Sequence, residues 1–374
     1  MEPFSVVIAG GGVAALEALL RLHRLAGDRV DVTVLAPNDD FVYRALSVGE
    51  PFSLGAAERH PLAPIIEHCE AHRIIDTLHS VELERGLLHT GRGDEISFDA
   101  LLVAVGAHAR PAFEQVRSFD DAQADELFRG VVQDVEDGYV KRIAFINPSG
   151  PVWPLPLYEL ALMTAAKGYD AGLNDLHIDL ITAEPQPLPA FGAEVSAAVG
   201  ALLAEAEIEV HTSEEPVVAA KGRLALRSEG RELEVDSMVA MPQLFGPSIG
   251  GIPGPTRHGF IPIDRHCAVP GTGSRIFVAG DAADFPVKQG GVGAQAADVA
   301  AAAIARQAGA DVEVADFRPL VQGKLMTGSG PKFLSARYVG GEGFDSVIAD
   351  EPIGTGSSEK VTALELGPYL DQAG

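Results

Sequence analysis

Glycines close to the start of the chain have the spacing of a phosphate-binding turn. Gly10, Gly12 and the small Ala15 form the pattern G-x-G-x-x-A. Gly10 allows a tight turn, Gly12 lets the backbone approach a pyrophosphate, and Ala15 lets a helix pack close to the preceding strand. The N–H groups of Val13 and Ala14 then face the phosphate at the positive end of that helix. The segment predicts a nucleotide-phosphate site.

A second segment, near residue 280, adds a carboxylate and a cation. The apolar run 276–279 predicts a strand that ends at Gly280 and Asp281, and Asp281 can bind a polyol hydroxyl or cap a helix. Lys288 adds a positive charge, and the glycine-led helix start at 290–295 suits negative charge that develops on a bound ring. A phosphate cradle and a polyol-binding carboxylate in one chain indicate FAD.

The ribose-binding acid of NAD sites is missing from its usual place. A strand expected over 30–35 should end in Asp or Glu, about 20 positions after the glycines. Ala36 stands there instead, and Asn38 or a backbone group can take that role. This departure weighs against NAD at the first site more than against FAD.

The elements that must position these residues alternate between apolar strands and amphipathic helices. This pattern is typical of parallel sheets with crossover helices. It predicts an α/β fold with two Rossmann-like three-layer domains, the second inserted in the first, with small antiparallel inserts and an irregular C-terminal segment. We expect residues 1–112 and 242–310 to form a FAD-binding domain, residues 113–241 an NAD(P)-type domain, and residues 311–374 the C-terminal segment.

Composition excludes several classes of function. The 374 residues carry a net charge of -25, which disfavours nucleic acid and anionic membrane surfaces as partners. No apolar run reaches the ~20 residues of a membrane span, so we expect no stable membrane insertion. The two cysteines, Cys69 and Cys267, are not spaced as a pair, which makes the cytoplasm the expected location. His68 and His72 have helical metal-site spacing but no third ligand nearby, so we expect no metal.

Several of these motifs carry a family resemblance. The Gly10 pattern, the segment 98–106 and Ala279-Gly280-Asp281 resemble the two-dinucleotide-fold flavoproteins of the pyridine nucleotide-disulfide oxidoreductase superfamily. The segments 41–44 and 286–291 are similar to the sulfide:quinone oxidoreductase and type II NADH dehydrogenase branch. The resemblance covers roughly residues 4–335.

The resemblance implies non-covalent FAD and assigns residues to it. The pyrophosphate would lie at residues 10–15, the ribitol at Asp281 and the ring near residues 290–295, with Tyr43 and Arg44 along the cofactor and the backbone of Leu78 at the adenine. The expected cofactor-binding residues are therefore Gly10, Gly12, Val13, Ala14, Ala15, Asn38, Tyr43, Arg44, Leu78, Gly106, Gly280, Asp281, Lys288, Gly290, Gly291 and Gln295.

The second nucleotide motif of the family is degenerate here. If Glu159 is its terminal acid, its three glycine places hold Val152, Pro154 and Leu157, whose side chains obstruct a phosphate and whose proline lacks an N–H donor. NAD(P)H is still not excluded, because Glu184 ends the next strand where a ribose ligand would lie.

The redox cysteines of the sulfide-oxidising relatives are also not found at their places. Where those enzymes have the first of them, this chain has Trp153, and no cysteine follows Cys267. Because thiolates are the sulfur-accepting groups, the usual persulfide route is not expected.

These observations predict a FAD-dependent oxidoreductase that passes electrons from NAD(P)H or another small two-electron donor to a quinone-like or small protein acceptor. Glu159 and Lys288 are the candidate catalytic residues. The alternative is a FAD-binding electron-transfer subunit of a larger complex without its own NAD(P)H site, and sulfide:quinone oxidation ranks last. A homodimer or a redox partner protein is compatible with the sequence.

Overall fold

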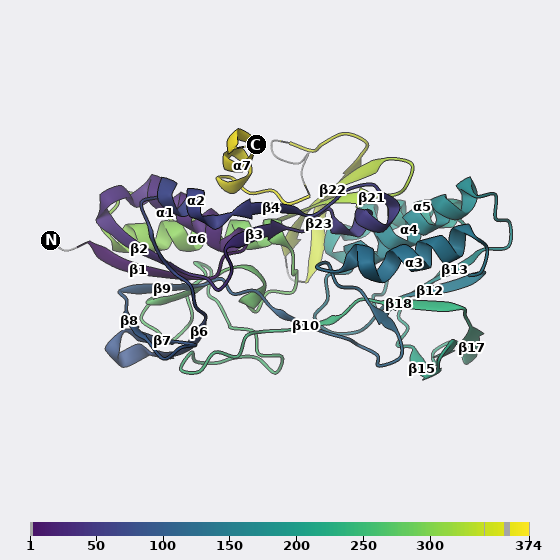
Figure 1. Cartoon of the computed structure of the whole chain (residues 1–374), viewed down its shortest axis with the longest axis horizontal. Coiled ribbons are helices and arrows are strands. Elements are labelled where there is room, and N and C mark those ends of the chain that lie inside the picture. The colour runs from purple at the N-terminus through teal and green to yellow at the C-terminus, as the bar shows by residue number, and fades with distance from the viewer. Residues whose placement is uncertain (1–2, 340, 355–359, 374) are drawn as a thin grey trace.

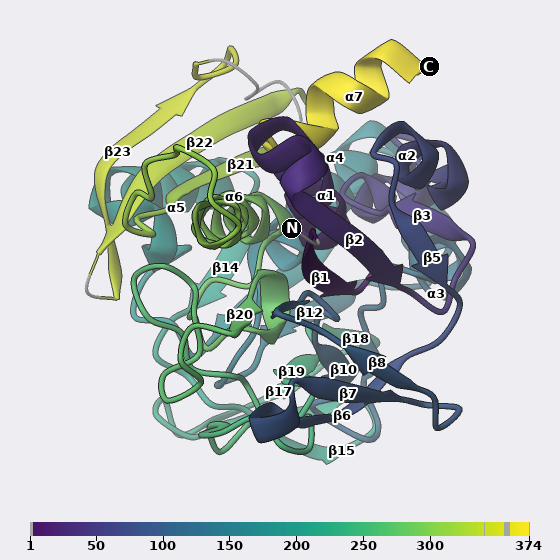
Figure 2. The same ribbon diagram turned by 90° about the vertical axis from the view of Figure 1, so that its left-hand side faces the viewer.

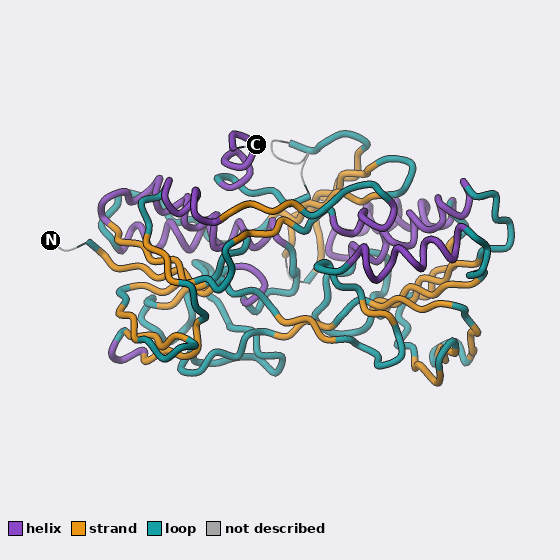
Figure 3. The backbone as a smooth tube through the Cα atoms, in the orientation of Figure 1, coloured by secondary structure: helices purple, strands orange, loops and turns teal. Residues whose placement is uncertain are grey.

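Two α/β lobes lie side by side along the long axis of the molecule, as the computed structural model shows (Figure 1). The structure describes residues 3–339, 341–354 and 360–373. In both lobes the helices gather on one side of a parallel sheet and smaller antiparallel sheets lie on the other (Figure 3). The fold class expected from the sequence is confirmed.

The first lobe is built on a five-stranded sheet in the order β20-β9-β1-β2-β5, with every pair of neighbouring strands parallel. Its strands are β1 (Phe4–Ala9), β2 (Val30–Leu35), β5 (His72–Ile74), β9 (Ala100–Val103) and β20 (Ile276–Val278). The helices of this lobe are α1 (Val13–Ala26), α2 (Leu62–His68) and α6 (Gly290–Gln307). The other strands are β3 (Asp40–Tyr43), β4 (Glu58–Pro61), β6 (Leu78–Glu82), β7 (Leu87–Thr90) and β8 (Glu95–Ser97).

Alternation along the central strand explains the three layers. In β1, Val6 and Ile8 belong to the apolar core under α1 and α6, whereas Val7 and Ala9 belong to the core shared with the β6-β7-β8 sheet. Because both faces of this sheet are covered, its strands are apolar throughout, as expected for parallel strands. Small residues let the two helices approach each other: Gly293 of α6 lies against Gly280 and Ala14.

The second lobe repeats this plan with the strand order β11-β18-β12-β13-β14, again all parallel. Its strands are β11 (Arg117–Ser118), β12 (Arg142–Asn147), β13 (His177–Thr182), β14 (Ile208–His211) and β18 (Ser237–Ala240), and its helices are α3 (Ala124–Glu136), α4 (Leu155–Asp170) and α5 (Gly192–Glu205). An antiparallel sheet of β15 (Val217–Ala220), β16 (Arg223–Leu226) and β17 (Arg231–Glu234) covers the other face. The two-stranded pair of β10 (His108–Arg110) and β19 (Gln243–Phe245) joins the lobes.

The C-terminal segment is not irregular, so that expectation is wrong. Residues 320–349 form an antiparallel sheet of β21 (Leu320–Met326), β22 (Pro331–Val339) and β23 (Glu342–Ala349), and α7 (Leu366–Ala373) follows. Alternating burial along β21 shows why a sheet forms: its apolar positions face the second lobe's core through Val321 and Leu325. Of the glycines that suggested irregularity, Gly328 lies close to Ala166 and Gly343 lies close to the backbone of Ala190 and Phe191.

The chain crosses from lobe to lobe as expected, since β20 and α6 return to the first sheet after the second lobe is complete. The boundaries 1–112, 113–241, 242–310 and 311–374 stay a prediction. Within the described residues, no helix is long and apolar enough to cross a membrane.

Candidate functional site

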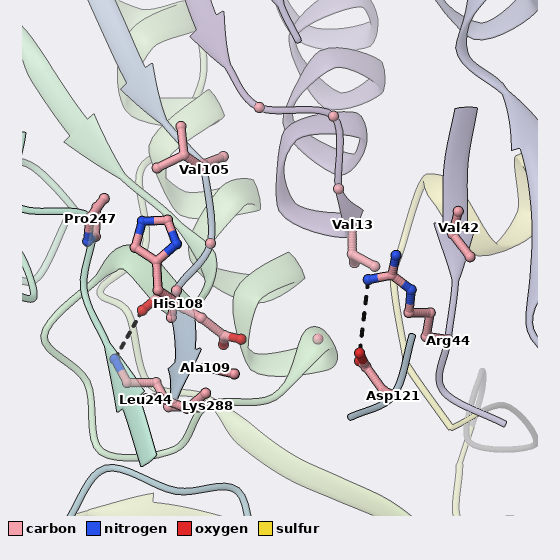
Figure 4. A pocket seen from close by; sticks show the side chains of 18 of the residues that line it. Val13, Val42, Arg44, Val105, His108, Ala109, Asp121, Leu244, Pro247 and Lys288 are labelled. Carbon is pink, nitrogen blue, oxygen red and sulfur yellow. Dashed lines mark hydrogen bonds and ion pairs between the residues drawn. The ribbon is translucent and has the colours of Figure 1, made fainter. Parts of the chain in front are cut away.

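A cavity of about 1170 Å³ lies where the two lobes and the C-terminal segment meet. It opens at the carboxyl ends of β1, β2 and β9, which is where ligands bind in open α/β sheets. Its wall includes the expected cofactor residues Gly10, Gly12, Val13, Asn38, Tyr43, Arg44, Leu78, Gly106, Asp281, Lys288 and Gly290. Figure 4 shows several of these side chains around it.

The glycine turn has the shape of a phosphate cradle. Gly10 has φ +134°, and a Cβ there would collide with the carbonyl group of Ala104. Gly12 is the N-cap of α1, makes no side-chain cap and leaves open space where a Cβ would stand. No acidic residue occupies the first turn of α1. The free N–H groups at this helix end, together with the helix dipole, suit a pyrophosphate.

Asp281 lies in the wall of the cavity and does not cap α6. The N-cap of α6 is Gln289, whose Oε1 accepts the N–H of Val292 at 3.0 Å. Burial raises the pKa of Asp281, and the nearby charge of Lys288 opposes that rise. Asp281 is therefore not the N-cap of α6, and its binding of a ligand hydroxyl stays a prediction.

Lys288 is held in place by backbone oxygens. Its Nζ donates to the carbonyls of Asp281 and Ala283 and lies 3.5 Å from the centroid of the Phe260 ring. The side chain is buried, and burial lowers its pKa to about 8. Lys288 thus presents a fixed cation to the cavity and also closes the 281–288 loop.

Arg44 reaches across the cavity from the first lobe to the second. Its guanidinium lies 3.8 Å from the Asp121 carboxylate (Figure 4). The Asp121 side chain is 53% exposed, and the charge of Arg44 favours its ionised form. The pair links the cofactor side of the cavity to the opposite lobe.

Glu159 and Lys360 form a buried ion pair in the cavity wall. Their Oε2 and Nζ atoms are 2.7 Å apart, and the Glu159 side chain is fully buried. Glu159 Oε1 also accepts the N–H of Met326 at 3.0 Å. Burial raises the pKa of Glu159, while Lys360 opposes that rise. The candidate catalytic carboxylate is therefore tied to the C-terminal segment.

That segment also covers the start of α6. The N–H of Val361 donates to the Tyr43 hydroxyl at 3.1 Å, and a Cβ at Gly290 would lie 3.0 Å from the Val361 side chain. Gln289 binds the carbonyl of Lys360 at 3.3 Å. Lys360 and Val361 both line the cavity.

Some expected cofactor residues do not line the cavity. Ala14, Ala15, Gly280, Gly291 and Gln295 are not part of its wall. Gln295 departs most clearly from the expectation: its amide binds the carbonyls of Gly291 and Leu320, and its Oε1 accepts the N–H of Leu320 at 2.8 Å. Its role in the structure is to join α6 to β21.

The second nucleotide segment has no room for a second cradle of the first kind. Pro154 is the N-cap of α4, Pro156 follows in its first turn, and Trp153 packs on Phe191 at 5.9 Å between ring centroids. Glu184, the remaining ribose-ligand candidate, accepts from Tyr158 at 2.9 Å and from Asn147 and Thr182 at 3.1 Å. Its burial raises its pKa to about 7. The carboxylate is engaged within its own lobe.

The remaining candidates have structural surroundings. Cys69 and Cys267 are buried in the apolar core, and burial raises both thiol pKa values, that of Cys69 to about 12. His68 packs on Tyr369 of α7, at 5.3 Å between ring centroids. Among the described residues one group has metal-site geometry, Asp179, Glu209 and His211, but a bidentate Arg142 already binds Asp179.

Residues 158–309 match the family model described as pyridine nucleotide-disulphide oxidoreductase. Taken with the fold and the cradle, the match identifies a FAD-dependent oxidoreductase. A comparison with curated protein sequences finds no match.

Solved structures share the fold of this oxidoreductase at low sequence identity. The sulfide:quinone oxidoreductase of Aquifex aeolicus has a TM-score of 0.80 and 19% identity, covering 92% of this chain and 86% of that one. A ferredoxin reductase from Rhodopseudomonas palustris has a TM-score of 0.66 and 20% identity, covering 89% of this chain and 82% of that one. A chain from the structure of the Tetrahymena thermophila mitochondrial ATP synthase has a TM-score of 0.69 and 12% identity, covering 92% of this chain and 89% of that one.

The family implies FAD bound without a covalent link, and the wall of the cavity fits it. Gly12 and Val13 offer free N–H groups for the pyrophosphate, Asp281 offers a carboxylate for the ribitol, and Gly290 begins a helix whose positive end suits a reduced ring. Bound there, FAD would supply the two-electron redox chemistry.

Gln289, Asp121 and Lys360 are among the wall residues that were not foreseen from the sequence. Gln289 directly precedes the glycines of α6, so the rule that Asn, Asp, Ser or Thr caps a helix could not identify it. Asp121 and Lys360 carry no motif, because only the tertiary fold brings them to the cavity.

Proposed function

We propose that this oxidoreductase takes two electrons from a small donor and passes them through FAD to a quinone-like or small protein acceptor. The observation that carries the proposal is the single cavity. It joins the cofactor cradle at Gly12 and Asp281 to residues of the second lobe and to the buried pair Glu159–Lys360. Room for a cofactor and a reacting partner thus lies in one continuous space.

The acceptor classes rest on the printed names of the structural neighbours. One reduces quinone and another is a ferredoxin reductase. Glu159 and Lys360 suit this half of the reaction, since a carboxylate with a raised pKa beside an ammonium can hold and move a proton at Oε2 when a quinone is reduced. Lys288 would add fixed positive charge. We place the protein in the cytoplasm, on the strength of its unpaired cysteines.

The test uses flavin that has been reduced chemically. The holoprotein is photoreduced without oxygen and then mixed with decylubiquinone, menadione or a plant-type ferredoxin in separate experiments. Return of the oxidised flavin spectrum with at least one of them supports the proposal. A flavin that stays reduced with all three contradicts it.

An electron-transfer subunit is the second candidate, supported by the similar chain in a mitochondrial ATP synthase structure. Here FAD would stay bound without small-molecule turnover. Purification from the native source in a stable hetero-complex, together with a free chain that reduces no acceptor, would favour this function over the first.

A further inference from the structure

We propose that the electron donor of this cavity is a small, uncharged and largely apolar molecule, not a reduced nicotinamide dinucleotide. The inference rests on the proposed function, because it names the donor class for the same FAD site. Three features of the second-lobe wall carry it: its charge, its apolar surface and the space it leaves.

The charge of this wall opposes a phosphate-bearing donor. The charged residues that the second lobe contributes are Asp120, Asp121 and Glu159, all acidic, and none of the wall residues described between 113 and 241 is Lys, Arg or His. The pyrophosphate of NADH would meet acidic groups where nucleotide sites offer N–H groups or cations.

The cations elsewhere in the wall are already engaged. Lys360 is paired with Glu159 at 2.7 Å and Arg44 faces Asp121 at 3.8 Å, whereas the cation of Lys288 is held at the 281–288 loop, on the FAD side of the cavity. The positive end of α1 lies on the first-lobe side, at the FAD cradle. A second pyrophosphate therefore has no free counter-charge on the second-lobe side.

The surface of this wall is apolar. It consists of two aromatic side chains, Phe119 and Trp153, with Leu155, Pro156 and Met241 of the second lobe, and is continued by Pro242, Leu244 and Pro247 of the adjoining segment. Trp153 is half-buried and fixed against Phe191, so a ring that stacks on it would find a rigid partner. Pockets of this composition bind apolar and aromatic ligands, with a few polar groups to orient them.

The space also limits the size of the donor. The cavity of about 1170 Å³ is somewhat larger than the pocket of a single ordinary ligand, about 300–1,000 Å³. FAD is itself a dinucleotide and would take up a large share of this volume, so the space left favours a small donor. In the reaction the donor loses two electrons and one proton as a hydride, which the flavin accepts, and the donor leaves in its two-electron-oxidised form.

The test compares two donors with the same reacting ring. NADH and N-benzyl-1,4-dihydronicotinamide both transfer hydride from dihydronicotinamide, but the second lacks phosphates. The FAD-loaded protein is mixed anaerobically with each donor, and the rate at which the flavin absorbance is lost is measured. This rate is divided by the rate at which the same donor reduces free FAD. We expect the normalised rate with the benzyl compound to be at least about 100-fold higher, within the 10–10³ range of electrostatic effects on association.

The outcomes separate this inference from the proposed function. Equal or faster normalised reduction by NADH overturns the inference, as does failure of the benzyl compound to reduce a flavin that can be photoreduced. Neither result affects the acceptor experiment, which starts from photoreduced flavin and tests the proposed function alone.

Binding is measured independently through Trp153, the single tryptophan of the chain. Quenching of its fluorescence by the benzyl compound, in the FAD-loaded protein, should saturate, whereas ADP-ribose should leave it unchanged. Asp120→Asn should raise the normalised NADH rate and leave that of the benzyl compound unchanged. Saturable binding of ADP-ribose, or an Asp120→Asn variant with an unaltered ratio of the two rates, would contradict the proposal.

Discussion

At the residue scale, the two glycines of the cradle have different physical roles. Gly10 is required by the fold, since its φ is +134° and a Cβ would collide with the backbone of Ala104. Gly12 has an ordinary φ of -94° and open space beside it. The spacing of the motif indicates both positions. Only the structure shows that Gly10 is needed for the fold and that Gly12 leaves room for the ligand.

Gly10→Ala should therefore destabilise the protein, by about 1–2 kcal/mol for the left-handed backbone alone and by more because of the collision. Gly12→Ala, its matched control, should keep the melting temperature of the FAD-free protein and weaken FAD binding at least about tenfold, or 1.4 kcal/mol. Thermal melts and FAD titrations measure both. Equal loss of stability in the two variants would contradict this division of roles.

The Glu159–Lys360 ion pair could not be predicted from the sequence. Glu159 was a candidate from its motif, whereas Lys360 lies in a tail without one. Contact between them depends on the path of the whole C-terminal segment, which no local pattern encodes.

Lys360→Met leaves the Glu159 charge buried and unpaired, which should cost about 3–5 kcal/mol of folding stability. Adding Glu159→Gln should restore most of it, since a neutral amide tolerates burial better. Denaturant unfolding of the two single variants and the double variant gives the coupling. If the effects of the single variants simply add, the pair does not act as a buried unit.

At the element scale, most of the α/β framework could be predicted and the C-terminal sheet could not. The apolar runs of β1, β2 and β9 and the glycine-led helices α1 and α6 have strong local signals. β21, β22 and β23 could not be predicted because glycines at 328, 330, 340, 341 and 343 suggested loops, while their strand character depends on packing against the second lobe.

The path of the tail depends on one buried carboxylate. Glu17 of α1 accepts the N–H groups of Glu365 and Leu366, at 2.9 and 2.7 Å, and thereby caps the start of α7 (Figure 2 shows α7 against α1). Arg21 binds Glu365 at 2.9 Å on the same face. Since α7 follows directly on Lys360 and Val361, this cap holds the covering segment over the cavity.

Glu17→Ala should release α7, at a cost of about 0.5–2 kcal/mol for the lost cap. Hydrogen exchange should then become faster at residues 364–370 and stay unchanged in β12 and β13. Glu126→Gln, in the first turn of α3, is a control that should leave α7 protected. Unchanged exchange at α7 in Glu17→Ala would show that other contacts hold the segment.

At the scale of the whole molecule, acidic charge dominates the surface and also enters the interior. Asp298 of α6 lies beside Glu17 and Glu365, and burial and these charges raise its pKa from 3.8 to about 8. The pKa of Glu184 is raised to about 7, and hydrogen bonds to Asp179 and Glu229 raise the pKa of His211 as well. In each case the folded state holds a proton more tightly than the unfolded chain.

Stability should consequently fall as pH rises from 6 to 8. Where the folded state binds more protons than the unfolded state, the free energy of unfolding decreases with pH. Stability is lost between pH 4.5 and about 7 through Glu184, and between pH 3.8 and about 8 through Asp298. The lowered pKa of Lys288 has the opposite effect on stability, and only above about pH 8. Thermal melts should show the drop, roughly 2–4 °C per kcal/mol.

Asp298→Asn removes one of these protons, so its melting temperature should fall less than that of the wild type between pH 6 and 8. A wild-type melting temperature that rises over this interval would contradict the assignment of buried protonated carboxyl groups. A variant with the same slope as the wild type would show that Asp298 is not one of them.

The account depends most on one claim, that the cradle at Gly12 and the carboxylate at Asp281 together hold a dinucleotide flavin. Titration of the flavin-free protein with FAD and with FMN, followed by flavin fluorescence and equilibrium dialysis, tests it directly. We predict that FAD binds tightly, one molecule to a chain, and that FMN, which lacks the adenylate half, binds weakly or not at all. Equal affinity for both flavins, or no uptake of FAD, would contradict the central claim.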